Sequence, residues 1–397
     1  MSTTRRSFVR TIGLSAVSVT GAAIACRGLE AELAAQALGQ VMPEIPAGAI
    51  RISSNENPHG PGPHVVTAVQ KALVAEGNRY SRTPGVLAGV VAQAQNVPPA
   101  SVLMASGSGD LLRAAVLAYT SASRPLVTGV PSYEGPVRVA EALAVPVSGV
   151  PVTGALGLDL PAMVRAAKGA GLVFLCNPNN PTGTVLPKAA VASAIGEIRA
   201  ASPSTVIVVD EAYYDCVDDP AYGSLASLAA ETPGVMVLRT FSKIHGLAGL
   251  RIGYAVGHPD TLAKYRMYVG QSVISNVSAA AALASLEDTA YYQSQRRLNL
   301  ETRAWTTKAL TDLGYAPVPS QANFVLVDVR RDVRAFNAAC RAKGVLVSRP
   351  FPPLVTHARI SIGTRDEMTR AMDVFRDVLT MPATAASTTV PAQERAR

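Results

Sequence analysis

One lysine in this chain lies among side chains that suit a phosphorylated aldehyde. Lys243 follows the hydroxyl residues Thr240 and Ser242 directly, and Arg251 stands eight positions after it. A lysine amine can condense with an aldehyde, while hydroxyl groups and a guanidinium can hold a phosphate dianion. A plain turn between two elements could have the same composition, so the assignment depends on a second feature.

That second feature is a carboxylate at the end of an apolar stretch. Asp210 lies in the run VVDEAYY, residues 208–214, upstream of Lys243. A pyridinium nitrogen stays protonated, and therefore withdraws electrons, when a fixed carboxylate lies beside it. The lysine and the aspartate together predict a site for pyridoxal 5′-phosphate.

Short apolar runs predict the elements that position these side chains. They cover residues 125–130, 172–176, 206–209, 235–238 and 252–256. Continuous runs of Val, Ile and Leu bounded by Gly, Pro or Asn are typical of parallel strands that are buried on both faces. We therefore expect an α/β fold with a mostly parallel sheet and helices on both faces. Such sheets bind ligands at their strand ends, which is where the pattern places Asn180, Asp210 and Lys243.

The remaining pattern divides the chain into segments. A long polar helix around Trp305, strands near 322–329 and 357–362, and a helix near 366–380 indicate a smaller α+β domain. A chain of this length and 48% hydrophobic content has room for about two or three domains. The expected segments are a signal peptide (1–25), a linker (26–45), an arm contributing to the small domain (46–75), a large cofactor-binding domain (76–294), the small C-terminal domain (295–381) and a disordered tail (382–397).

The first 25 residues have the form of a twin-arginine export signal. Arg5 and Arg6 precede an uncharged stretch, residues 11–25, that ends in the small residues AIA. At about fifteen residues this stretch is short for a membrane span of about twenty; an N-terminal amphipathic helix or an anchor is the alternative. We expect the twin-arginine export machinery to carry the folded protein to the periplasm. Lipidation at Cys26 is disfavoured by Ala23, where such sites usually have Leu.

The charge and the cysteine pattern argue against a nucleic-acid-binding protein and against a metal-binding protein. The formal net charge of +8 falls to +5 once the leader and its three arginines are removed. Charged residues make up only 16% of the chain and form no basic run interleaved with aromatics, so nucleic-acid binding is not indicated. Cys176, Cys216 and Cys340 have no paired metal spacing, so we expect buried thiols and no metal.

Ordered motifs between residues 45 and 380 resemble those of one enzyme family. They include SSNENP (53–58), CNPNNPTG (176–183), SQANF (320–324) and RISIGT (359–364) around the aspartate and lysine runs. Together they are similar to the fold-type I pyridoxal-phosphate aminotransferases of class I/II, and most of all to the histidinol-phosphate aminotransferases. The resemblance implies a homodimeric transaminase whose small-molecule substrates are an amine donor and a 2-oxo acid.

The resemblance assigns most of the site residues to the cofactor. Lys243 would bond to it and later move a proton at the substrate Cα, while Asp210 would hold the ring nitrogen. Tyr213 and Asn180 would bond the ring O3′ oxygen, and Tyr133 would stack on the ring. Three groups of residues would hold the phosphate. The first is Gly107, Ser108, Gly109 and Asp110, which precede a helix expected to begin at Leu111. The second is Thr240, Ser242 and Arg251, and the third is Tyr80, which would reach the phosphate of the neighbouring subunit. The family has Ser, Asp and Glu after the second of these glycines, where this chain has Asp110 and two leucines, so side-chain roles there stay open.

The resemblance assigns fewer residues to the substrate. Arg359 would bind a carboxylate through two parallel hydrogen bonds, with Asn57, Asn180 and Asn323 as further candidates. Histidinol-phosphate enzymes commonly have Tyr at the position of His59.

Histidinol-phosphate aminotransferases also commonly have the sequence Val-Arg-Pro where this chain has VSRP at 347–350. The extra residue moves Arg349 by one position and therefore onto the other face of an expected strand. The physiological amine therefore stays open. A decarboxylase or a β-eliminating lyase would use the same lysine and aspartate, and a catalytically silent periplasmic binding protein is the alternative from another class.

Overall fold

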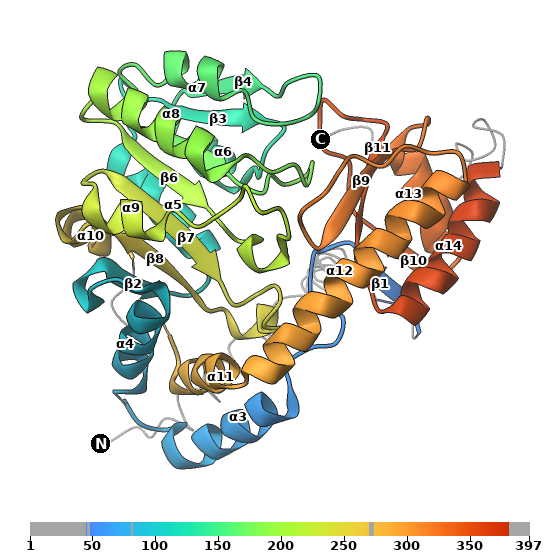
Figure 1. Ribbon diagram of the computed structural model, residues 1–397, viewed down its shortest axis with the longest axis horizontal. Coiled ribbons are helices and arrows are strands. Elements are labelled where there is room, and N and C mark those ends of the chain that lie inside the picture. Colours follow the sequence, from blue (N-terminus) through green and yellow to red (C-terminus); the bar gives the residue numbers. More distant parts are fainter. Residues whose placement is uncertain (1–44, 46–47, 81, 270–273, 381–397) are drawn as a thin grey trace, which may run out of the picture. The chain divides into compact units, whose positions relative to one another are not determined.

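A seven-stranded sheet is the framework of the larger part of the protein, shown as a computed structural model in Figure 1. The structure describes residue 45 and residues 48–80, 82–269 and 274–380, and the part from Ile50 onward forms one compact unit. The predicted signal peptide, Cys26 and the tail lie outside the described residues. The strands lie in the order β2 (Val102–Ala105), β8 (Gly253–Gly257), β7 (Val235–Thr240), β6 (Val206–Asp210), β5 (Leu172–Cys176), β3 (Leu126–Val130) and β4 (Val147–Pro151).

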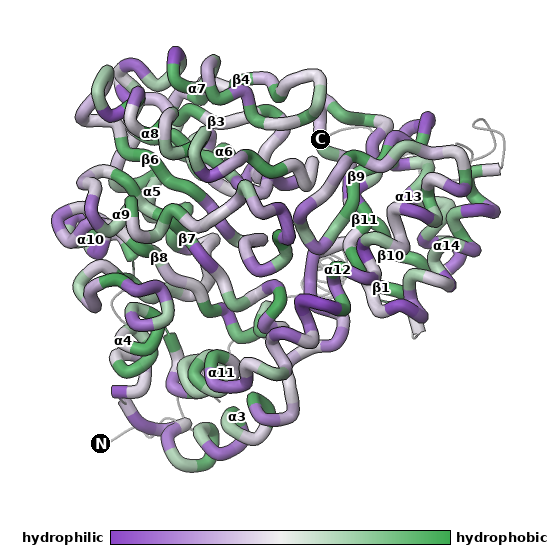
Figure 2. The backbone as a smooth tube through the Cα atoms, in the orientation of Figure 1, coloured by the Kyte–Doolittle hydropathy of each residue, from purple (hydrophilic) through white to green (hydrophobic). Residues whose placement is uncertain are grey.

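Neighbouring residues of the central strands point to opposite faces of the sheet, and both faces are buried. Val208 and Met236 pack in the core formed with α5 (Ser108–Tyr119), α6 (Gly135–Ala142) and α10 (Pro259–Arg266). Ile207 and Val237 pack in the core on the other side, formed with α7 (Leu160–Ala166), α8 (Lys188–Ala201) and α9 (Ala226–Glu231). Because both faces are covered, strands such as β6 are hydrophobic up to their last residue, which in β6 is Asp210 (Figure 2). The predicted α/β fold with a mostly parallel sheet is confirmed.

Strand β8 runs antiparallel to both of its neighbours, β7 and β2. The sequence predicts a parallel strand at the apolar run 252–256, and the antiparallel direction of β8 corrects that prediction. A parallel return requires a crossover that is usually helical, whereas loop 241–252 folds back so that Thr240 pairs with Gly253. The loop therefore begins and ends at the same edge of the sheet, and it carries both Lys243 and Arg251.

A second group of strands and helices surrounds its own apolar core. In it, β9 (Phe324–Asp328) pairs antiparallel with β11 (His357–Ser361), and β1 (Ile50–Ile52) pairs parallel with β10 (Val345–Val347). These strands share a core with α12 (Thr289–Asp312), α13 (Val333–Ala342) and α14 (Arg365–Thr380), on the right of Figure 1. This is the predicted α+β arrangement, and β1 leads the chain straight into residues 53–58.

A third group of helices packs beside β2 and β8. It consists of α3 (Pro63–Glu76), α4 (Thr83–Gln95) and α11 (Asn276–Glu287). Three short 3₁₀ turns, η1 (Pro99–Ser101), η2 (Tyr214–Cys216) and η3 (Ala248–Leu250), complete the described elements. The prediction of buried thiols is confirmed for Cys176, Cys216 and Cys340, which are free and buried. Within the described part of the chain, no helix is long and apolar enough to cross a membrane.

Candidate active site

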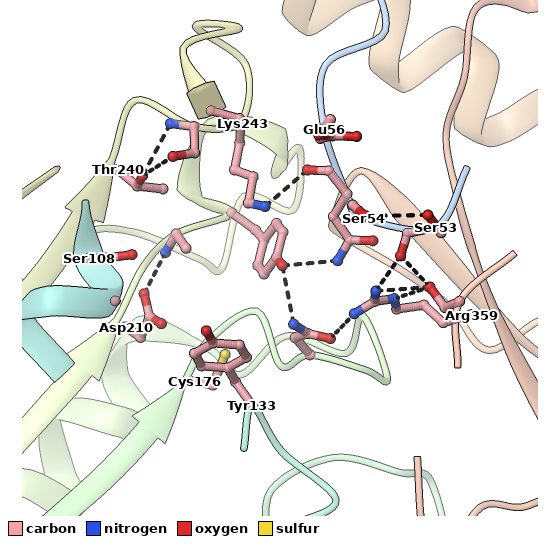
Figure 3. Close-up of a pocket in the computed structure, with 18 of the residues that line it drawn as sticks. Ser53, Ser54, Glu56, Ser108, Tyr133, Cys176, Asp210, Thr240, Lys243 and Arg359 are labelled. Atoms are coloured by element: carbon pink, nitrogen blue, oxygen red, sulfur yellow. Dashed lines mark hydrogen bonds between the residues drawn. The ribbon is translucent and has the colours of Figure 1, made fainter. Parts of the chain in front are cut away.

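A cavity of about 680 Å³ lies where β5, β6 and β7 end (Figure 3). Asn180, Asp210 and Lys243 all line it, as the strand-end argument predicts. Residues 53–56, which follow β1, and residues 348–359, which lie between β10 and the middle of β11, supply much of the opposite wall. The cavity is therefore enclosed by the sheet on one side and by the smaller group of strands on the other.

Asp210 is the last residue of β6 and is buried at the bottom of this cavity. Its carboxylate accepts a hydrogen bond of 3.1 Å from the backbone N–H of Ala212. Burial raises the pKa of Asp210 to about 7, because a charged carboxylate is poorly stabilised away from water. A positively charged group entering the cavity beside it would favour the ionised form.

Lys243 reaches into the cavity from loop 241–252. Its Nζ donates a hydrogen bond of 3.0 Å to the backbone carbonyl of Asn55 and lies 5.4 Å from the centre of the Tyr213 ring. Burial and, to a smaller extent, the positive charge of Arg359 lower the pKa of Lys243 to about 8. Much of the amine is therefore uncharged near pH 8, which is the form that attacks a carbonyl carbon.

The Tyr213 hydroxyl lies at the centre of a hydrogen-bond network. It accepts bonds from the side-chain amides of Asn55, at 3.0 Å, and Asn180, at 3.3 Å. Burial raises the pKa of Tyr213, so the phenol keeps its own proton available for a ligand oxygen. Asn55 is a site residue that the sequence analysis missed. It is buried, has a left-handed backbone with φ of 55°, and its side-chain oxygen accepts a bond of 2.7 Å from Ser361.

The start of α5 and the end of loop 241–252 form a cradle for an anion. The helix begins at Ser108, three residues before the predicted Leu111, and Gly107 precedes it with φ of 83°. A Cβ at Gly107 would come within 2.6 Å of the Arg251 guanidinium, and a Cβ at Gly253 within 2.6 Å of the Ser108 backbone nitrogen. Glycine at both positions thus lets the guanidinium and the helix N-terminus approach one space, and both favour negative charge.

Two buried hydroxyls complete this side of the cavity. Thr240 donates a hydrogen bond of 2.9 Å to Ser242, and both residues line the cavity with Ser108 and Gly109. The donor set of helix N-terminus, hydroxyls and guanidinium matches a phosphate dianion. Since a reactive amine and a buried carboxylate face the same cavity, the residues present fit pyridoxal 5′-phosphate.

Arg359 lies on β11 and is almost fully buried on the opposite side of the cavity. Its guanidinium donates to Asn180 Oδ1 at 2.7 Å, to the backbone carbonyl of Ser53 at 2.9 Å and to the Ser348 hydroxyl at 2.9 and 3.1 Å. Burial lowers the pKa of Arg359 to about 10. Within the described residues its hydrogen-bond partners are all uncharged, so its positive charge remains for a ligand.

Five predicted site residues do not line this cavity: Asp110, Asn57 and Asn323, together with Gly107, which precedes α5, and Tyr80. Asp110 points instead to Arg113, whose guanidinium donates to it at 2.8 Å, because residues three apart face each other on a helix. Asn57 donates to the backbone carbonyl of Ile244, and Asn323 donates to those of Asn55 and Glu56. The two asparagines therefore hold the walls in position rather than face the cavity.

The structure also places Tyr80, His59 and Arg349, whose roles the sequence left open or assigned to a neighbouring subunit. Tyr80 is fully exposed and does not line the cavity of its own chain. His59 lines a separate cavity of about 20 Å³. Arg349 lies beyond the end of β10 at Val347, so the expectation that it occupies a strand face is wrong. It lines the main cavity and forms an ion pair with Glu134.

The fold and the cavity define a pyridoxal-phosphate-dependent transferase, and the comparison with known families identifies which one. The family described as aminotransferase class I and II matches residues 47–375. The chain belongs to this family and is a transaminase that uses pyridoxal 5′-phosphate.

Individual relatives are similar over most of the chain. Histidinol-phosphate aminotransferase from Symbiobacterium thermophilum is 37% identical over 333 residues, which cover 83% of this chain and 90% of the relative. Aromatic amino acid aminotransferase from Mycolicibacterium vanbaalenii is 37% identical over 324 residues, covering 81% and 89%. The crystal structure of histidinol-phosphate aminotransferase from Sinorhizobium meliloti in complex with pyridoxal-5′-phosphate has a TM-score of 0.79 and 28% identity, covering 87% of this chain and 94% of that one.

Proposed function

We propose that this cavity moves an amino group from an amino acid or a related amine to a 2-oxo acid, with Lys243 and Asp210 as the central pair. The observation that supports it is the shared cavity of a buried amine with a lowered pKa and a buried carboxylate with a raised pKa. Such opposed shifts are typical of catalytic groups.

Pyridoxal phosphate, when bound, supplies an aldehyde that takes up amino groups and a ring that withdraws electrons from the substrate Cα. Asp210 would hold a proton on the ring nitrogen, because the ionised carboxylate is then paired with a cation. Lys243 Nζ would carry the proton that leaves and returns at Cα, oriented by the carbonyl of Asn55. The phenol of Tyr213 and the amide of Asn180 would hold the ring oxygen between them.

The two ends of the site would bind two anions. The cradle of Ser108, Gly109, Thr240, Ser242 and Arg251 would hold the cofactor phosphate. Arg359 would bind the substrate carboxylate and so orient the bond at Cα. The similarity to histidinol-phosphate and aromatic amino acid aminotransferases makes histidinol phosphate and aromatic amino acids the first amines to test.

A homodimer and periplasmic localisation are parts of the same proposal. The exposed hydrophobic residues Leu73, Val74, Tyr80 and Val86 lie on and between α3 and α4, and such a patch supports burial against a second copy of the chain. Tyr80 would then reach the phosphate of the neighbouring site. The arginine pair at residues 5–6 supports twin-arginine export, which changing both arginines to lysine should abolish.

Transamination is tested by following both products of one reaction. The purified protein should convert an amine donor and a 2-oxo acid, pyruvate or 2-oxoglutarate, into the matching keto product and amino acid in equal amounts. Borohydride should fix the cofactor on Lys243, as peptide mapping would show. Lys243→Ala should abolish turnover while Lys71→Ala, on the exposed face of α3, keeps it. Release of CO₂ or ammonia without a keto product would contradict transamination.

A further inference from the structure

Two arginines line the outer half of the cavity, away from Asp210 and the cradle. Their guanidinium carbons lie 4.4 Å (Arg349) and 4.6 Å (Arg359) from the centre of the same ring, that of Phe351. Two guanidinium groups that line one cavity beside the same ring would suit a ligand with two anionic groups. Whether they do so depends on what each arginine already binds.

Arg349 is already paired with a carboxylate. Its Nη2 donates to Oε1 of Glu134, which lies just before α6 and follows Tyr133 in the cavity wall. The second nitrogen, Nη1, donates to the backbone carbonyl of Pro350 at 2.9 Å. The side chains of Arg349 and Glu134 are 50% and 29% exposed, so water and ligands can reach the pair.

Arg359 differs from Arg349 in this respect. It donates only to uncharged groups within the described residues, those of Ser53, Asn180 and Ser348. Glu56, the other carboxylate in the outer wall, lies 3.5 Å from Arg51. Glu134 also lies 3.5 Å from Arg138, which is largely exposed and does not line the cavity. Of the two arginines that line the outer half, Arg359 alone has no carboxylate partner within the described residues, and a substrate carboxylate would neutralise it.

From this distribution of charge we infer that Glu134 determines substrate specificity by neutralising Arg349. The preferred substrates carry one anionic group, a carboxylate at Arg359, and an uncharged side chain beside the Glu134–Arg349 pair. A distal phosphate or second carboxylate would have to displace Glu134 from Arg349 and would then lie next to that carboxylate, which repels it. The inference rests on the proposed function and specifies its substrate class.

The same selection applies to both halves of the reaction, because the amine and the 2-oxo acid occupy one cavity in turn. Pyruvate and aromatic 2-oxo acids should therefore be better acceptors than 2-oxoglutarate. Phenylalanine should be a better donor than glutamate, whose side chain carries a second carboxylate.

A pair of ligands that differ only at the distal end tests the inference without turnover. 3-Phenylpropionate and 3-phosphonopropionate both present a carboxylate, and calorimetry on the cofactor-loaded enzyme at pH 8 gives their dissociation constants. Wild type should bind 3-phenylpropionate more tightly by about tenfold or more. Glu134→Gln should tighten 3-phosphonopropionate by about tenfold and leave 3-phenylpropionate within about twofold.

Two further variants test whether the tighter binding of 3-phosphonopropionate in Glu134→Gln depends on Arg349. Adding Arg349→Gln to Glu134→Gln should remove the gain for 3-phosphonopropionate. Glu141 is an exposed carboxylate on α6, the helix that follows Glu134. Glu141→Gln should change the dissociation constant of neither ligand. The inference is overturned if wild type prefers 3-phosphonopropionate, if Glu134→Gln leaves the ratio unchanged, or if no variant binds either ligand.

Turnover separates this inference from the proposed function. The ratio of kcat/KM for phenylalanine over glutamate should fall in Glu134→Gln. If both ligands bind as expected but no amino group reaches any 2-oxo acid, transamination is wrong and the charge selection stands. If transamination occurs with a preference for doubly anionic substrates, only the selection by Glu134 is wrong.

Discussion

The amine of Lys243 donates a hydrogen bond of 3.0 Å to the backbone carbonyl of Asn55, a residue 188 positions earlier in the chain. The same carbonyl accepts a bond of 2.9 Å from the amide of Asn323. The direction of the lysine is therefore set by the segment that follows β1, and that segment is itself held by the end of the loop before β9. Three distant parts of the sequence must meet before the amine is positioned.

Asn55 should show separate backbone and side-chain effects. Its φ of 55° is costly for Ala and costless for Gly, so Asn55→Ala should lower the free energy of unfolding by about 1 kcal/mol more than Asn55→Gly. Both variants lose the bond to the Tyr213 hydroxyl and should lower kcat/KM to a similar extent, by about tenfold. Urea unfolding and steady-state kinetics check the two effects, and equal stability of the two variants would exclude backbone strain.

Lys243 should titrate near pH 8 in the cofactor-free protein. The rate of its acetylation, followed by mass spectrometry, should rise with a midpoint at about pH 8 because burial lowers the pKa of Lys243. Removing the positive charge of Arg359 should move that midpoint upward, since a nearby cation disfavours the ammonium form.

The matched control is Arg365→Gln, which removes a guanidinium that lies over the Trp305 ring instead. An unchanged midpoint in Arg359→Gln would show that the guanidinium does not influence the amine.

Asp210→Asn should stabilise the cofactor-free protein at high pH while damaging the enzyme. The pKa of Asp210 is about 7, against 3.8 for an ordinary aspartate, so the folded state holds this proton more tightly than the unfolded state. The free energy of unfolding therefore decreases as pH rises from about 4 to about 7, and the variant avoids this loss, by about 4 kcal/mol at pH 8. Below about pH 4 the two proteins should be equally stable.

The cofactor-loaded variant should lose activity by about a hundredfold or more, because an amide cannot keep the ring nitrogen protonated. Thermal or urea unfolding across pH 4 to 8 and single-turnover kinetics are the measurements. Asp260→Asn, a largely exposed position, should alter neither. A variant less stable than wild type at pH 8 would contradict the raised pKa of Asp210.

Arg359→Lys should weaken the binding of carboxylate substrates. A lysine keeps the charge but cannot make two parallel hydrogen bonds, so the KM for phenylalanine should rise by about ten- to a hundredfold. Ser348→Ala removes a partner of the guanidinium and leaves the charge, and should raise KM by no more than about threefold. 2-Phenylethylamine, which lacks the carboxylate, should be affected by neither change. Loss of activity toward both amines alike would indicate a general structural defect.

The main edge of the site could be predicted from sequence because buried parallel strands leave a clear signal. Both faces of β5 and β6 are covered, so the strands are continuous apolar runs, and the polar residue that ends each run is conspicuous. Asp210 stands out because it ends β6, and Asn180 because it lies in the polar segment that follows β5. The short apolar run of β8 is buried on both faces in the same way, and that burial carries no information about strand direction.

The opposite wall could not be predicted in the same way. Residues 53–58 form no regular element, so no periodicity indicates which of Asn55 and Asn57 faces the cavity. The orientation of Asn55 depends on Ser361, which is 306 positions away. The pairing of Arg349 with Glu134 is likewise set by the fold, over a separation of 215 residues.

The hairpin-like return of loop 241–252 has a consequence for how this enzyme can diversify. The reactive amine and the phosphate-binding arginine belong to one short loop tied at both ends to the sheet, where Thr240 pairs with Gly253. An insertion or deletion there would change the spacing of the two groups at once, so the loop can evolve only by substitution. Residues 348–351 belong to a separate loop, which can acquire a new length and new chemistry without changing the spacing of Lys243 and Arg251.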